Sequence, residues 1–173
     1  MTNSTISTNS GNLSKTHYTF EGWNTLANGS GITYSTSSSI TLSSDLTLYA
    51  KWVEITHTLT YNANGADTGS IPVSSVVGEV TTSTVSTNSG SLSKAHYNFS
   101  GWNTSSDGSG TTYSTSSTIT LNADETLYAV WTPVDYTLTF NSNSADTGSV
   151  PASFDITYLT NGTVSTNSGN LTK

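Results

Sequence analysis

Apolar and polar residues alternate in short runs along most of the chain, as in β-strands with one buried face. Residues 56–63 (THTLTYNA) place Leu59 and Tyr61 on one face and threonines on the other. Residues 89–96 (SGSLSKAH) form the one predicted helical piece, and Gly and Asp in DGSG (107–110) predict a turn. Runs rich in Thr, Val, Tyr, Phe and Trp predict further strands at 79–86, 95–102, 111–114, 117–121 and 125–131.

The pattern occurs twice. Residues 22–52 and 101–131 share the motif GWNT and a later motif in which one residue separates LYA from Trp (LYAKW and LYAVW). Lys15, Lys94 and Lys173 lie 79 residues apart. The register holds without an insertion, as expected for tandem duplication of one structural unit. The sequence therefore predicts a mostly β (α+β) fold, made of modules with a 79-residue period and at most one short helix each.

Composition excludes several classes of partner. The 173 residues carry 4 Lys and Arg against 11 Asp and Glu, a net charge of -7, so neither nucleic acid nor an anionic membrane surface is an expected partner. Apolar runs are shorter than the roughly 20 residues that span a bilayer, which predicts no membrane insertion. Without cysteine, disulfides and thiolate metal sites are ruled out. The surface of Ser, Thr, Asn and Gly suits an extracellular protein, and the first residues do not have the pattern of a signal peptide.

The signature residues are predicted to form the core. Trp52 and Trp131 end alternating strands and should pack inward with leucine, and Gly22 and Gly101 predict a bulge or a close backbone approach. The predicted core set is Phe20, Gly22, Trp23, Leu48, Tyr49, Trp52, Phe99, Gly101, Trp102, Leu127, Tyr128 and Trp131. The alternative is a sugar-stacking platform, in which Tyr34 and Tyr113 contact a glycan together with Trp23 and Trp102.

Residues typical of catalysis or metal binding do not form a site that both copies keep. Acidic residues lie in predicted turns, where a carboxylate caps backbone N–H groups. The histidines lack partners nearby in sequence, and His57 is replaced by Tyr136 in the next copy. We predict a protein that is not an enzyme and has no cofactor or metal. The turn carboxylates are those of Asp45, Asp67, Asp107, Asp124 and Asp146.

Three stretches of the chain are similar to a known repeat. They are YTFEGWNTLANGSGITY with LTLYAKW, YNFSGWNTSSDGSGTTY with ETLYAVW, and TLTYNANGADTGSIP. The repeat that they resemble is the Listeria-Bacteroides repeat, or internalin B-type repeat, of bacterial and some archaeal surface proteins. The resemblance implies β-grasp-like modules in tandem at the cell surface, with stalk, spacer or adhesive roles and no catalytic residues. Family members usually have Gly where His17 and His96 stand, so a positive φ should be less strictly required here.

In the phase of that family, residues 57–131 form a complete module, residues 1–52 the back part of one, and residues 134–173 the front part of another. A partial module should expose an apolar face and unpaired strand edges. Either the chain is a slice of a longer array, or the front part of one copy completes the back part of the next and builds a head-to-tail fibre. Against the fibre, the TNSGNL(S/T)K segment would then be present twice in the shared module.

The functional prediction is a structural or adhesive stalk or fibre subunit outside the cell. Its expected partners are other copies of the chain or neighbouring repeats, and a glycan or protein of a host or matrix. The alternative is a carbohydrate-binding module of a surface protein or a secreted enzyme.

Overall fold

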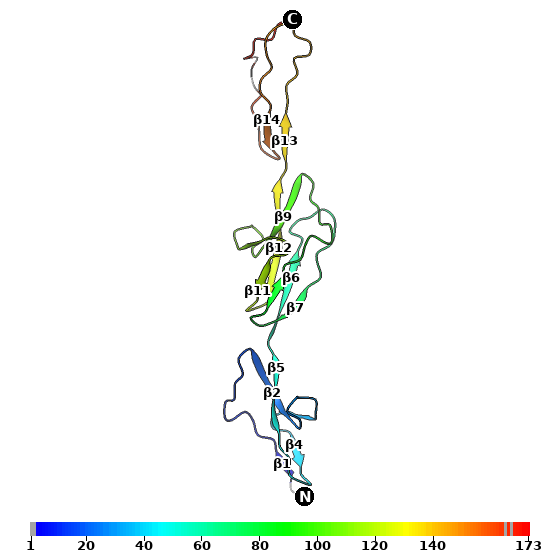
Figure 1. Ribbon diagram of the computed structural model, residues 1–173, viewed down its shortest axis with the longest axis vertical. Helices are drawn as coiled ribbons and strands as arrows, with labels where there is room; N and C mark the ends of the chain where they lie inside the picture. The colour runs from blue at the N-terminus through cyan, green and yellow to red at the C-terminus, as the bar shows by residue number, and fades with distance from the viewer. Residues whose placement is uncertain (1–2, 165, 167) are drawn as a thin grey trace. The chain divides into compact units, whose positions relative to one another are not determined.

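A computed structural model describes residues 3–164, 166 and 168–173 (Figure 1). These residues form short strands joined by turns and loops, with no helix among them. The mostly β prediction is confirmed, while the β-grasp arrangement stays a prediction. The strands are β1 (Asn3–Thr5), β2 (Tyr18–Asn24), β3 (Thr33–Tyr34), β4 (Ser39–Thr41), β5 (Tyr49–Glu54), β6 (Thr56–Asn62), β7 (Ser75–Gly78), β8 (Thr82–Thr84), β9 (Tyr97–Asn103), β10 (Thr112–Tyr113), β11 (Thr118–Thr120), β12 (Glu125–Pro133), β13 (Asp135–Leu138) and β14 (Phe154–Thr157).

The same strand pairings recur along the chain. Strands β3-β2-β5 form one sheet and β1-β4 another, and the later copy repeats them as β10-β9-β12 and β11-β8. In the later copy β6 and β7 extend the larger sheet, which has the order β10-β9-β12-β6-β7. Strands β13 and β14 repeat the antiparallel pair β6-β7.

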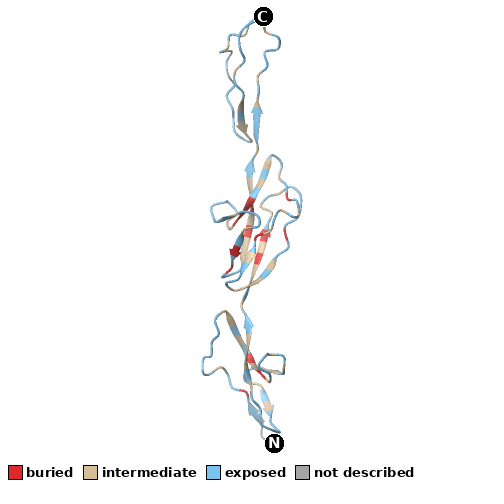
Figure 2. Ribbon diagram, in the orientation of Figure 1, coloured by how far each residue is buried: buried red, intermediate tan, exposed pale blue. Residues whose placement is uncertain are grey.

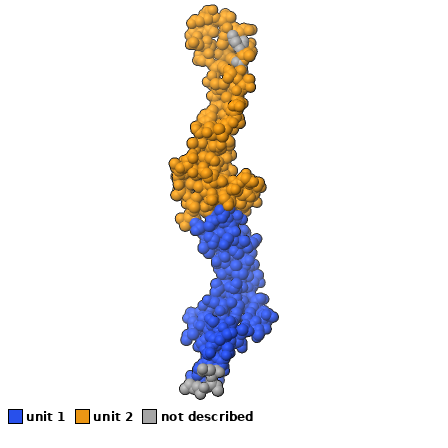
Figure 3. All heavy atoms as spheres, turned by 180° about the vertical axis from the view of Figure 1, so that it is seen from behind, with its two compact units in different colours: residues 1–60, 74–84, 118–126 blue, residues 61–73, 85–117, 127–173 orange. Residues whose placement is uncertain are grey.

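The chain forms two compact units, coloured separately in Figure 3. The first has residues 1–60, 74–84 and 118–126, and the second has residues 61–73, 85–117 and 127–173. These boundaries differ from the predicted modules at 1–52, 57–131 and 134–173, which stay a prediction. We use the names N-terminal segment for residues 1–54, central segment for 56–133 and C-terminal segment for 135–173.

Fully buried side chains concentrate in the strands of the central segment (Figure 2). Their alternation explains the strands: β6 buries Leu59 and Tyr61, and β12 buries Leu127 and Ala129, with the intervening residues more exposed. Burial of one such apolar side chain contributes about 1.5–3 kcal/mol to folding.

The helix predicted at residues 89–96 is wrong. The side chain of Asn88 closes the loop instead, because it donates to the carbonyl of Leu92 at 2.8 Å and accepts from the amide of Leu92 at 2.7 Å. Ser93 then bridges to Thr68, and Lys94 to Tyr97. These partners lie outside the segment, so they compete with the local bonds that a helix would need.

Gly22 and Gly101 lie where the sequence predicts a bulge, and the structure confirms it. The register of β2 against β5 shifts between Phe20 and Gly22, and that of β9 against β12 shifts at Trp131. A Cβ on Gly101 would stand 2.7 Å from the carbonyl oxygen of Tyr113. Only a residue without a side chain allows the backbones to approach this closely.

The expectation of a relaxed backbone at the two histidines is wrong. His17 and His96 have φ of 65° and 64°, the left-handed conformation that glycine adopts without strain. Each histidine ends a tight turn in which the amide of the next tyrosine donates to a lysine carbonyl, Tyr18 to Lys15 and Tyr97 to Lys94. The turn therefore holds both histidines at positive φ.

Candidate interaction sites

The carboxylates serve individual turns and strands. Asp107 accepts bonds from the amide and hydroxyl of Ser109 at 3.0 and 2.7 Å, and these bonds, the hydroxyl first, lower its pKa from the usual 3.8. Asp67 accepts from the amide of Ala95, and Asp124 from the amide of Thr58, both at 2.7 Å. Across the described ranges, His, Asp and Glu do not gather in groups of three that could hold a metal ion.

The aromatic signature residues make the same contacts in both copies. Phe20 meets Trp23 and Trp52 edge-on, with ring centroids 5.4 and 5.6 Å apart. Phe99 meets Trp102 and Trp131 in the same way, at 5.2 and 5.8 Å. The tyrosines and leucines of the predicted core set differ in exposure: Tyr49 is exposed, Leu48 and Tyr128 are half-buried, and Leu127 is fully buried.

Burial separates the two copies. Trp102 and Leu127 have no exposed surface, whereas Trp23 and Leu48 at the corresponding positions are only half-buried. In the central segment the ring of Tyr61, on β6, lies edge-on against Trp102 at 4.7 Å. Its hydroxyl accepts the amide of Ser86 at 2.9 Å, and Trp102 Nε1 donates to the carbonyl of Ser86. Strand β6 thus completes the core.

In the N-terminal segment, the corresponding face is an open groove of about 330 Å³. Among the described residues, no strand stands beside β5 where β6 stands beside β12. Leu42 is 52% exposed there, against 3% for Leu121, which lies 79 residues later. We call this cavity the open groove; it is lined by Ser4, Thr5, Ile6, Ser7, Trp23, Ile40, Leu42, Leu46 and Leu48.

The sugar-stacking alternative loses one member, because Trp102 is fully buried and cannot stack on a ligand. Tyr34 and Tyr113 are half-buried at the ends of the short strands β3 and β10. Two polar clefts recur near the second tryptophan of each copy, and neither has Tyr34 or Tyr113 among its lining residues. Lys15 and Trp52 line one cleft, and Lys94 and Trp131 line the other.

Two buried asparagines organise the turn after the signature tryptophan, a role that sequence reasoning missed. Asn103 donates to the carbonyls of Gly108 and Gly110 and to the hydroxyl of Thr112, and it accepts the amides of Ser105 and Gly110. Asn24 makes the same five bonds in the first copy. The same asparagine occurs in both GWNT motifs, and this recurrence was the sequence feature that could have identified its role.

Single residues connect the segments and bond to both sides. Within the first unit, the amide of Ile55 donates to the carbonyl of His17, and its own carbonyl accepts the amide of Glu79, at 2.9 and 2.8 Å. Within the second unit, Val134 repeats this between His96 and Tyr158, both at 2.9 Å. Both backbone groups of each connector are therefore satisfied.

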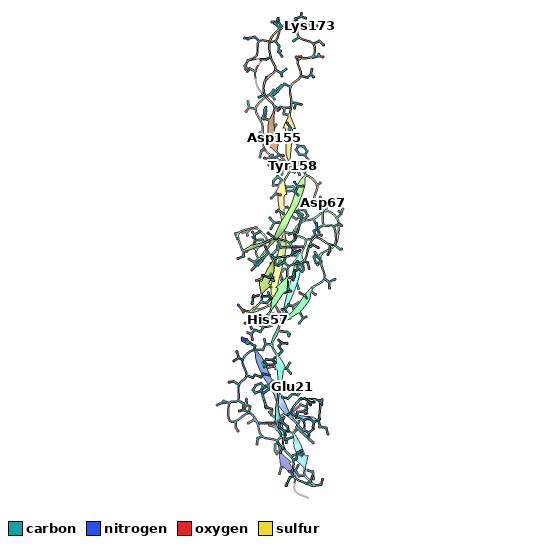
Figure 4. All side chains as sticks on the ribbon, viewed as in Figure 1. Glu21, His57, Asp67, Asp155, Tyr158 and Lys173 are labelled. Carbon is teal, nitrogen blue, oxygen red and sulfur yellow. The ribbon has the colours of Figure 1, made fainter. Side chains whose placement is uncertain are left out.

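Side chains at the two junctions differ although the backbone bonds are the same. His17 Nδ1 lies 3.2 Å from a carboxylate oxygen of Glu79. At the second junction, His96 stacks on Tyr158 with centroids 4.4 Å apart, and its Nδ1 lies 2.7 Å from the hydroxyl of Tyr136. His57, labelled with Tyr158 in Figure 4, has a buried Nε2 that makes no hydrogen bond with the described residues.

Comparison with known proteins matches the sequence of this chain to a family and to two relatives. The sequence model of the Listeria-Bacteroides repeat domain matches residues 1–51 and 57–130. A protein of Evansella cellulosilytica, whose name describes it as a Gly-rich membrane protein, is 37% identical over 142 residues, which are 77% of this chain and 16% of that protein. A second protein of that organism, named as a membrane protein, is 33% identical over 91 residues, 52% of this chain and 14% of its own length.

The chain thus spans less than a fifth of the length of either relative. No solved structure matches it. The described residues also contain no helix that is long and apolar enough to cross a membrane.

Proposed function

Because this chain belongs to the Listeria-Bacteroides repeat family, we propose that it is a non-enzymatic, force-bearing stalk module of an extracellular surface protein. The family is one of surface repeat proteins, and the relatives are named as membrane proteins. The further steps, from surface repeat to stalk, adhesin or fibre, rest on the arrangement of the strands through which the chain enters and leaves the central segment.

These two strands, β6 and β12, are neighbours in one sheet, and this observation carries the proposal. Thr60 contacts Glu125 and Thr126 at one end of the pair, and the side chain of Asn64 donates to the carbonyl of Ala129 near the other. Residue numbers rise together along both strands, so the two strands run parallel. Tension on the two ends then pulls β6 and β12 in opposite directions along their length and loads their bonds together.

The connectors support the same role. Ile55 and Val134 each link two segments through backbone hydrogen bonds on both sides, so no long flexible linker lies between β5 and β6 or between β12 and β13. A spacer transmits force and distance best when its connections are short and bonded. Head-to-tail assembly, in which a partial segment of one copy completes that of another, would extend the same design beyond a single chain.

Single-molecule force spectroscopy of the 173-residue chain, held at its two ends, tests the proposal. We expect one unfolding event at clearly higher force than the others, assigned to the central segment. Thr60→Ala should lower that force, because the Thr60 hydroxyl lies 2.7 Å from the Thr126 hydroxyl across β6 and β12. Forced unfolding reports the unfolding rate, so loss of a contact that resists shear appears directly.

Thr132→Ala is the matched control. Thr132 also lies on β12, but its hydroxyl donates to the carbonyl of Asn98 on β9, away from β6. Its removal should leave the high-force event in place. A chain whose segments all unfold at uniformly low force would contradict the force-bearing role.

A further inference from the structure

We propose that the open groove of the N-terminal segment binds residues 135–141 of a second copy of this chain as an added strand. The proposal rests on the proposed stalk function and names its partner. In the central segment, β6 lies beside β12. We place β13 of one copy beside β5 of the next copy in the same way.

The groove has the chemistry of the core that β6 completes. Positions 79 residues apart show it: Trp23 is half-buried and Leu42 is 52% exposed, whereas Trp102 and Leu121 are buried in the central segment. Ile6, at the wall of the groove, is already buried. Leu46, 42% exposed, adds a further apolar side chain. Water therefore covers apolar surface that the same fold buries when the strand is present, and its removal favours docking.

The strand that fits carries leucine and an aromatic ring two residues apart. In the central segment these are Leu59, fully buried, and Tyr61, stacked on Trp102. In the C-terminal segment they are Leu138 and Phe140, both half-buried. Strand β13 has one neighbour in the described part of the chain, β14, whereas β6 has two, β12 and β7. The edge of β13 that would face β5 is open to a new partner.

Docking does not require the duplicated segment at the end of the chain. Strand β1 already pairs with β4, as β8 pairs with β11. The second copy therefore needs to supply β13 and the residues directly after it, while its residues 159–173 stay outside the groove. The overlap noted in the sequence falls on the loop after β13, where the amides of Asp146 and Ser149 already donate to the carbonyls of Thr172 and Gly169 of their own chain. Residues 11–14 of the acceptor copy therefore stay outside the shared sheet. Because donor strand and groove are different surfaces of one chain, the contact propagates from copy to copy.

Cysteine pairing tests the register directly in a chain that has no cysteine of its own. The hydroxyls of Thr60 and Thr126 lie 2.7 Å apart across β6 and β12. The corresponding positions across the proposed interface are Thr139 of one copy and Thr47 of the next. The double variant Thr47→Cys/Thr139→Cys should give a ladder of disulfide-linked multimers on a non-reducing gel under mild oxidation.

Two further pairs serve as controls. Thr60→Cys/Thr126→Cys should form its bond within one chain and stay monomeric, which shows that the geometry permits a disulfide. Thr47→Cys/Thr137→Cys shifts the register by two residues, about 7 Å along a strand, and should give much less ladder. Absence of a ladder from the 47/139 pair, with the 60/126 bond formed, overturns the proposal.

Sedimentation over a range of protein concentrations measures the affinity between copies and gives a second readout. Phe140→Asp should abolish association, while Val164→Asp, at a position that is 67% exposed and outside β13, should not change it. Phe140→Tyr should strengthen association about fivefold, because it supplies to the Ser7 amide the acceptor that Tyr61 supplies to Ser86. Equal affinity for Phe140→Tyr and Phe140→Asp would contradict a ring seated in the groove.

A synthetic peptide of residues 133–142 should dissolve the assembly, and the same peptide with Leu138 and Phe140 replaced by serine should not. If the peptide with leucine and phenylalanine has no effect, another surface holds the copies together. Failure here leaves the stalk function testable, because the force measurement depends on β6 and β12 within one chain and not on association.

Discussion

Asn103 shows how a single polar side chain can determine the geometry of a turn. It is 1% exposed, yet all its hydrogen-bonding groups have partners, which removes the cost of burying an amide. The turn that it closes brings β9 back to β10. Asn24 repeats the arrangement bond for bond, so the feature belongs to the repeat and not to one location.

Asn103→Ala should therefore lower the free energy of unfolding by about 3 kcal/mol, since buried backbone groups of the turn lose their partners. Urea denaturation followed by tryptophan fluorescence would measure it. Asn98→Ala on the same strand is the control, because Asn98 is exposed and should change stability little. Similar small effects at both positions would show that water replaces the buried amide without penalty.

Asp107 makes the acid side of the stability profile predictable. Its pKa is lowered by the bonds from Ser109, so the carboxylate stabilises the folded state above the usual pKa of 3.8, and this contribution is lost as the pH falls through the folded-state value. Asp107→Asn should flatten that loss below pH 3.8, because Asn28 accepts the same two bonds from Ser30 without titrating.

Thermal unfolding across acidic pH would detect the change. The reciprocal variant, Asn28→Asp, should introduce the same loss in the first copy. If Asp107→Asn and the unmodified chain decline in parallel, the bonds to Ser109 do not stabilise the ionised form.

At the scale of the element, strands with a clear alternation of apolar and polar residues could be predicted, and those held by distant contacts could not. Strand β6 follows from local pattern, and so does the turn predicted at 107–110, which closes at residues 105–108 through the bond from the Gly108 amide to the Ser105 carbonyl. Strand β7 was missed because SVVG has no clear alternation and gains its structure from pairing with β6. Of the strand predicted at residues 79–86, only Thr82–Thr84 forms a strand in the structure.

The candidate site divides in the same way. The sequence predicted an exposed apolar face on a partial module, because the motifs show where each repeat unit begins and ends. It did not predict the buried asparagines or the connector bonds, since both depend on backbone groups whose positions emerge only in the fold. For Trp102 the sequence offered a core position and, as the alternative, a glycan platform, and its burial against Tyr61 excludes the platform.

A glycine can be required because its φ is positive or because another backbone lies too close for a Cβ. Three alanine variants distinguish these two constraints. Gly101→Ala should cost about 3 kcal/mol, because φ is +139° and its Cβ would also stand 2.7 Å from the Tyr113 carbonyl oxygen. Gly108→Ala should cost about 1 kcal/mol, because φ is +79° but no atom lies within 4 Å. Gly11→Ala has neither constraint and should be close to neutral.

Chemical denaturation of the three variants would give the order. If Gly108→Ala costs as much as Gly101→Ala, backbone conformation and not close approach is the dominant constraint at both sites.

For the whole molecule, strand pairings of the central segment recur in the N-terminal and C-terminal segments. The central segment joins five strands in one sheet, the N-terminal segment has an open groove, and β13 of the C-terminal segment pairs, within the described residues, with β14 alone. Stability should therefore depend on protein concentration in the end segments and not in the central one. Amide hydrogen exchange of the full chain at several concentrations would show this, and uniform protection at all concentrations would contradict it.

The buried turn amide also bears on how such a protein can be made. Asn103 begins the sequence Asn-Thr-Ser, an acceptor for N-linked sugars, whereas Asn24 is followed by Thr-Leu and is not. A glycan attached to Asn103 before folding would occupy the nitrogen that closes the turn, and no space exists for it in the folded core. In an export pathway that adds N-linked glycans during synthesis, this chain would have to fold before it was modified.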